Sequence, residues 1–148
     1  LFARGLGGYA SDYFNKSMGM RGRIIIHTVF LALEGALVLV FANTGTLAGS
    51  TVVLVFFSLC VQAAEGTSYG IVPYIDPPST GSISGIIGAG GNTGAVGFGL
   101  GFRQLGYKSA FMIMGITILG SSFLSLFIVI KGHAGLIWGK DDETPPGK

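Results

Sequence analysis

Charge is scarce in this sequence of 148 residues: only 11% are Asp, Glu, Lys or Arg, against about 25% in an ordinary globular domain. With 49% hydrophobic residues, so little charge excludes an intrinsically disordered chain. The net charge of +2 is too small for a nucleic-acid-binding surface, so no nucleic-acid partner is expected. Cys60 is the single cysteine, which excludes an internal disulfide framework and a zinc site built from cysteines.

Proline is also scarce, whereas glycine is abundant. The 26 glycines follow no three-residue period and only 5 prolines accompany them, which excludes collagen. The sequence begins at Leu1 without Met and has no basic segment or cleavage site typical of a signal peptide, so we interpret it as part of a longer protein. A glycine-rich, apolar chain with a mean hydropathy of +0.65 is typical of a membrane protein.

Windows without charge at 35–64, 77–102 and 109–130 predict membrane-spanning helices, each of which needs about 20 residues. Turn residues at 43–50 divide the first window. The sequence therefore predicts an all-α membrane protein with a partial span at about 1–13 and full spans at about 24–42, 51–74, 80–102 and 109–130. A soluble helical core is disfavoured, because the last two spans have no polar face.

Lysine and arginine in short loops predict how the spans are oriented. The linker at 14–23 and the polar tail at 131–148 hold six cations and lie on the same side. The opposite side holds only Arg103 and Lys108. The first linker and the tail are therefore expected in the cytoplasm.

Glycine spacing distinguishes the span at 80–102. Glycines recur at steps of three and four along two faces of this helix, which would let other helices pack closely against both. A phosphate-binding loop is excluded because the third glycine of its motif is replaced by Thr93 and no Gly-Lys-Ser/Thr follows. The amide of Asn92 must find a partner in hydrocarbon, either on another helix or on a ligand.

Three charged residues fall within the predicted spans. Arg4 can bind a planar anion through its forked guanidinium, form an ion pair, or extend to the membrane surface. Glu65 lies in a polar, small-residue interruption and is either a proton relay or the partner of a cation. Glu34 is interpreted as structural. No nucleophile–base pair or metal-ligand spacing occurs, so neither catalysis nor a metal or other cofactor is expected.

Three motifs resemble one known family. Gly8 and Asp12, followed by Gly19-Met20-Arg21-Gly22-Arg23, are similar to the loop motif of the major facilitator superfamily. Residues 1–23 more widely, with the segments at 62–74 and 88–95, are similar in order and spacing to the nitrate/nitrite porters of that superfamily. The segment at 88–95 resembles their second nitrate signature.

The resemblance implies that the chain comprises the end of span 8 through span 12 of a twelve-span carrier. It implies proton-coupled uptake of nitrate and nitrite for assimilation, by alternating access, in the plasma membrane. Arg4 would bind the anion, and Gly90, Gly91 and Asn92 would pack beside it. A small accessory membrane protein is a possible partner, as for some members.

The same resemblance assigns a gating role to the loop residues Gly8, Asp12, Arg21 and Arg23. Glu65 stands where family members commonly have an uncharged small residue, so its role in proton coupling stays open. Two alternatives also stay open: a facilitator for another small anion or solute, and a membrane sensor that binds nitrate without transporting it.

Overall fold

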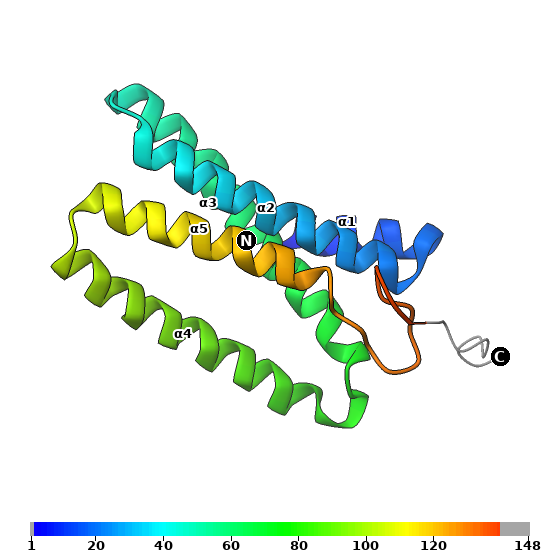
Figure 1. The fold of residues 1–148 in the computed structure, drawn as a ribbon. Coiled ribbons are helices and arrows are strands. Elements are labelled where there is room, and N and C mark those ends of the chain that lie inside the picture. Colours follow the sequence, from blue (N-terminus) through cyan, green and yellow to red (C-terminus); the bar gives the residue numbers. More distant parts are fainter. Residues whose placement is uncertain (1, 140–148) are drawn as a thin grey trace.

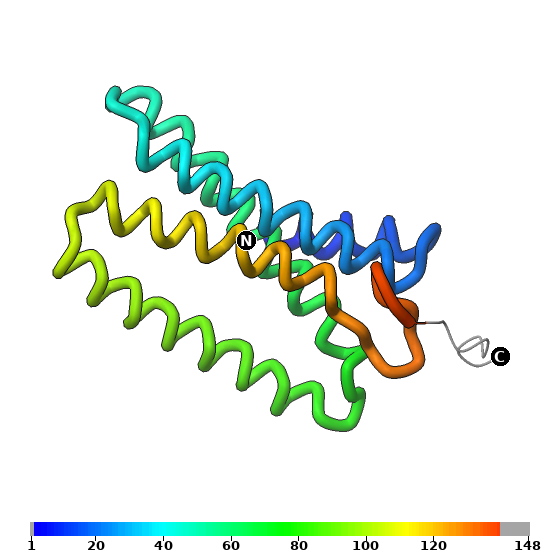
Figure 2. The backbone as a smooth tube through the Cα atoms, viewed as in Figure 1, coloured from blue at the N-terminus to red at the C-terminus, as the bar shows by residue number. Residues whose placement is uncertain are grey.

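The computed structural model describes residues 2–139, and all regular structure in that range is helical. The predicted all-α fold class is confirmed. Long antiparallel helices are joined by short turns (Figures 1 and 2). The α-helices are α1 (Phe2–Met18), α2 (Met20–Asn43), α3 (Leu47–Ile71), α4 (Thr80–Gln104) and α5 (Tyr107–Ser125), with 3-10 turns η1 (Val72–Tyr74) and η2 (Pro77–Ser79) between α3 and α4.

Three segments within the described part of the chain are long and apolar enough to cross a membrane: Met20–Asn43, Leu47–Tyr74 and Tyr107–Ser125. At about 1.5 Å per residue, α4 is also long enough for a hydrocarbon core of about 30 Å. Nine of its 25 residues are glycine, which lowers its mean hydropathy below that of the other three.

Helices α1, α2, α3 and α5 form one packed group, whereas α4 lies to one side of it (Figure 1). Helix α2 packs against both α3 and α5, and α1 packs against α3. Helix α4 has no buried residue. At its glycines other than Gly88, an added Cβ would meet nothing within 4 Å. The close packing that we expected along both glycine faces of α4 is therefore absent within residues 2–139.

Close glycine packing occurs instead where α1 meets α3. A Cβ on Gly7 would lie 2.7 Å from both Cα and the carbonyl carbon of Ala63, and closer still to its carbonyl oxygen. A Cβ on Gly66 would collide with the Arg4 carbonyl oxygen and lie 3.1 Å from its carbon. Because neither glycine has a side chain, the two backbones touch directly.

Several helix ends differ from the expected linkers. The linker expected at 14–23 is helical except at Gly19, whose positive φ of 61° is accessible to glycine without steric cost and turns the chain within one residue. Helix α5 ends at Ser125 rather than near 130.

The α1–α2 turn, the α3–α4 connection and the start of the tail meet at one end of the bundle (Figure 2). Arg21 Nε donates a hydrogen bond of 3.1 Å to the Gly135 carbonyl, and the Tyr74 and His133 rings lie edge to face at 5.7 Å. The first part of the tail is thus packed, whereas residues 140–148 lie outside the described range. This arrangement places the cationic first linker and the start of the tail at the same end of the bundle.

Candidate functional site

An ion pair links α1 to α3 at the point where their backbones touch. Arg4 Nη2 contacts Glu65 Oε1, and the two side chains keep 50% and 39% of their surface exposed. Gly66 follows Glu65 directly and lies against the Arg4 carbonyl, so the glycine contact fixes the distance between the two charged residues. Of the alternatives for Arg4 and Glu65, the structure therefore supports mutual pairing within the bundle.

A cavity of about 700 Å³ opens beside Arg4. Its lining residues are Arg4, Gly5, Gln62, Gly66, Tyr69 and Gly70, all from α1 and α3. The guanidinium is the only charged group among them, and a guanidinium presents parallel N–H donors that match a planar oxyanion. The cavity can therefore hold a small anion against Arg4.

A second cavity, of about 520 Å³, lies between α2, α3 and α4. Glu34, Glu65 and Ser68 line it from the packed group, and Gly91 and Asn92 line it from α4. Gly90 is not among its lining residues. Arg4 and the Gly91–Asn92 pair thus border two neighbouring cavities rather than one.

Tyr69 lines both cavities and was missed as a site residue. Gln62 was also missed. A usable signal was the spacing of Gln62, Glu65 and Tyr69, because residues three and four apart share a helix face. The helical break expected near Glu65 is absent, because α3 runs unbroken to Ile71.

Asn92 makes no side-chain hydrogen bond within residues 2–139. Its amide faces the second cavity rather than a polar group on a neighbouring helix. Within residues 2–139 the structure therefore shows neither of the two partners considered for Asn92, and the choice between another helix and a ligand stays open.

The loop-motif residue Arg23 is the centre of a hydrogen-bond network, and its side chain is only 7% exposed. Arg23 Nη2 donates to Asp12 Oδ1 at 2.6 Å and to the Tyr74 hydroxyl at 3.2 Å. Its Nη1 donates to the Ser11 hydroxyl at 3.3 Å and to the Gly70 carbonyl at 3.2 Å. Arg23 thus connects α1, α2 and the end of α3.

Arg21 and Gly8, which the motif grouped with Asp12 and Arg23, lie apart from that network. Arg21 bonds to the tail, at Gly135. Gly8 has open space where a Cβ would be. The structure therefore unites two of the four proposed gating residues.

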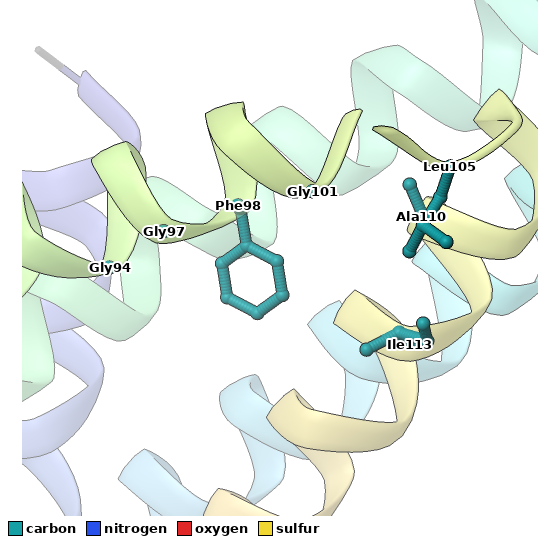
Figure 3. Close-up of a pocket in the computed structure, with 7 residues that line it drawn as sticks. All are labelled: Gly94, Gly97, Phe98, Gly101, Leu105, Ala110 and Ile113. Atoms are coloured by element: carbon teal, nitrogen blue, oxygen red, sulfur yellow. The ribbon is translucent and has the colours of Figure 1, made fainter. Parts of the chain in front are cut away.

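A third cavity, of about 300 Å³, separates α4 from α5 near their connecting turn. Figure 3 shows its lining residues, which are Gly94, Gly97, Phe98, Gly101, Leu105, Ala110 and Ile113. None of these side chains carries a charge or a hydrogen-bonding group, so this cavity is unsuited to an anion.

Comparison with known proteins gives consistent relatives. The chain is 42% identical over 95 residues to high affinity nitrate transporter 2.5 of Arabidopsis thaliana, covering 64% of this chain and 19% of that protein. It is 34% identical to nitrate transporter 2.1 of Chlamydomonas reinhardtii, and that match covers 94% of this chain and 27% of that protein. It is 33% identical to nitrate/nitrite transporter NrtP of a Picosynechococcus strain, and that match covers 97% of this chain and 29% of that protein.

No family model and no solved structure matches the chain. The chain spans between about a fifth and three tenths of the length of these curated relatives. All three are named as transporters. Since two of the matches cover nearly the whole of a chain that is helical and apolar enough to span a membrane, the chain belongs to the nitrate/nitrite porter family of the major facilitator superfamily.

Proposed function

We propose that the protein transports nitrate and nitrite through a membrane by alternating access, coupled to protons. We propose that the transport is uptake through the plasma membrane and that it supplies nitrate assimilation. The names of the relatives support the substrate class. The observation that carries the proposal is the half-exposed Arg4 guanidinium beside a cavity of about 700 Å³, next to α3, which is apolar and long enough to span a membrane.

Arg4 is the proposed anion-binding group. Nitrate is planar with three equivalent oxygens, so two of them can accept parallel hydrogen bonds from one guanidinium. Gly5 and Gly66 line the cavity without side chains and leave the approach to the guanidinium open. Gly90, Gly91 and Asn92 are proposed to contact the anion or its water shell from α4, with Asn92 as donor.

Glu65 is the proposed coupling residue. Its carboxylate and an incoming anion compete for the same guanidinium, because Arg4 already pairs with Glu65. Protonation of Glu65 removes the negative charge and releases the Arg4 donors. Nitrate binding is therefore expected to strengthen as the pH falls, and to weaken as the pH rises and the ion pair reforms.

Gly8, Asp12, Arg21 and Arg23 are proposed to gate the cytoplasmic end. The Arg23 network joins α1, α2 and α3, so its bonds must rearrange if these helices separate there. A small accessory membrane protein stays a proposed partner, and co-expression with and without it belongs in the transport assay.

The test is Arg4→Lys in the full-length protein, expressed in cells that lack nitrate carriers. Lysine keeps the charge but loses the fork, so the KM for nitrate should rise roughly tenfold or more. Arg103→Lys, the same exchange at an exposed position at the end of α4, is the matched control. Membrane delivery of both variants is measured with a fluorescent tag.

Unchanged nitrate kinetics in Arg4→Lys would exclude Arg4 as the anion clamp. Competition by nitrite, chlorate and neutral sugars identifies the substrate class. Nitrate binding without accumulation by the unaltered protein would instead identify a sensor.

A further inference from the structure

Glu34 is a membrane-embedded carboxyl that the proposed mechanism does not yet use. It lies near the middle of α2 and is half-buried. Among residues 2–139, no hydrogen bond or ion pair to its carboxyl is found. An ionised carboxylate without a partner is costly at this depth, and such residues commonly mark ion or proton pathways.

The second cavity joins Glu34 to Glu65. Both carboxyls line it, and Ser68, Tyr69 and Asn92 add polar groups along its walls. Its volume of about 520 Å³ has room for several waters, each of which occupies about 30 Å³ in the liquid. A chain of waters and hydroxyls can therefore connect the two carboxyls.

The two carboxyls lie at different depths. Glu34 is nine residues before the end of α2 at Asn43, whereas Glu65 is eighteen residues after the start of α3 at Leu47. Because α2 and α3 are joined at that end, Glu65 lies deeper by about 13 Å at 1.5 Å per residue. In the predicted orientation that end is the outer face of the membrane, so Glu34 is the outer of the two.

The other titratable groups near Glu34 come from α3, and the cation of α4, which also lines the cavity, is Arg103 in the last turn of that helix. Helix α3 contributes Cys60, Glu65 and Tyr69. The α1 cation Arg4 is paired with Glu65. In α5, the titratable residues are Tyr107 and Lys108, in its first turn. On α2 itself, His27 shares a hydrogen bond of 2.9 Å with Thr67. No described cation is therefore placed to pair with Glu34.

We propose that Glu34 is the outer proton-binding group of a proton path that runs through the second cavity to Glu65. The inference rests on the proposed function and adds the route by which Glu65 is protonated. One proton from the outer solution binds the Glu34 carboxylate, passes to a cavity water and then to the Glu65 carboxylate, and Glu34 returns to its ionised form. Arg4 is thereby released to bind the anion.

The test compares two transport modes of the full-length protein in proteoliposomes loaded with nitrate. Accumulation driven by an inward proton gradient requires net proton transfer, whereas nitrate exchange at equal pH on both sides does not. Glu34→Gln keeps the size and polarity of the side chain but cannot carry a proton. Glu34→Asp keeps the carboxyl, and Glu143→Gln makes the same exchange in the polar tail.

Glu34→Gln is expected to lower gradient-driven accumulation at least tenfold while exchange stays within twofold of the unaltered protein. Glu34→Asp is expected to retain most of the accumulation, and Glu143→Gln all of it. Equal loss of exchange and accumulation in Glu34→Gln would overturn the proposal in favour of a structural role, as would accumulation that is unchanged.

Accumulation driven by a sodium gradient at constant pH would also overturn the proton path. If the unaltered protein neither exchanges nor accumulates nitrate, the proposed function itself fails. If instead the unaltered protein transports nitrate and Glu34→Gln has no effect, only the proton path is excluded and the proposed function stands.

Discussion

The contact between α1 and α3 allows a sharp prediction about a single methyl group. In Gly7→Ala, the new Cβ would lie 2.7 Å from Cα and the carbonyl carbon of Ala63, whereas ordinary contacts of a Cβ begin near 3.4 Å. The obstructing atoms are backbone and cannot rotate away. Helix α1 must therefore move away from α3 by about 1 Å, and overpacking of this kind typically costs about 1–3 kcal/mol.

The displacement should also be visible at the site, because Arg4 lies one helical turn before Gly7 on the same helix. Moving α1 outward lengthens the ion pair with Glu65 and widens the neighbouring cavity. We expect Gly7→Ala to lower the apparent melting temperature of the purified protein by several degrees.

Gly5→Ala and Gly8→Ala are matched controls for the stability measurement, since an added Cβ at either position meets nothing within 4 Å. Alanine also favours a helix over glycine, so both controls should melt at or above the temperature of the unaltered protein. A Gly7→Ala variant as stable as these controls would refute the close approach of α1 and α3.

Two further predictions concern other contacts in the bundle. Arg23→Lys should destabilise the purified protein by about 2 kcal/mol in thermal unfolding, because one ammonium cannot replace four hydrogen bonds, one buried and three part-buried. Asp12→Asn should cost less than about 1 kcal/mol because Asp12 is 62% exposed, and equal losses in the two variants would contradict the asymmetry in burial. Gly115→Ala should cost less than Gly7→Ala in the same measurement, because its two nearest obstructions are atoms of the flexible Leu39 side chain and the Gly35 carbonyl oxygen is 3.2 Å away. The reverse order would contradict a contact that Leu39 can relieve by moving.

The fold class could be predicted because its signal is local. Windows without charge and the turn residues near Asn43 indicate antiparallel apolar helices without any tertiary information. Helix ends were less predictable, since they depend on single residues. Gly19 alone separates α1 from α2, and the Thr46 hydroxyl accepts a hydrogen bond from Gly49 N–H and starts α3 four residues before the expected span.

The glycines show where sequence reasoning reaches its limit. Spacing identified α4 as a helix that can be approached closely, yet within residues 2–139 the close approaches occur on other helices, at glycines such as Gly7, Gly66 and Gly35. The spacing of small residues indicates which helix faces can be approached closely, whereas the packing of the whole bundle determines which faces are in contact. The pairing of Arg4 with Glu65 was open for the same reason, since the two residues are far apart in sequence and only the packing of α1 on α3 joins them.

If the protein works as proposed, the Arg4–Glu65 pair also determines what form the proton coupling takes. An arginine without a counter-ion would bind an anion at any pH, and the carrier would gain nothing from a proton. When the arginine is already paired, the anion must displace a carboxylate, and a proton on that carboxylate removes the competitor. Coupling between two ligands is reciprocal, so the factor by which protonation tightens nitrate binding equals the factor by which nitrate tightens proton binding. Glu65→Gln should abolish both of these reciprocal effects. Nitrate affinity should become high and independent of pH, and nitrate binding should no longer take up a proton from a weakly buffered solution.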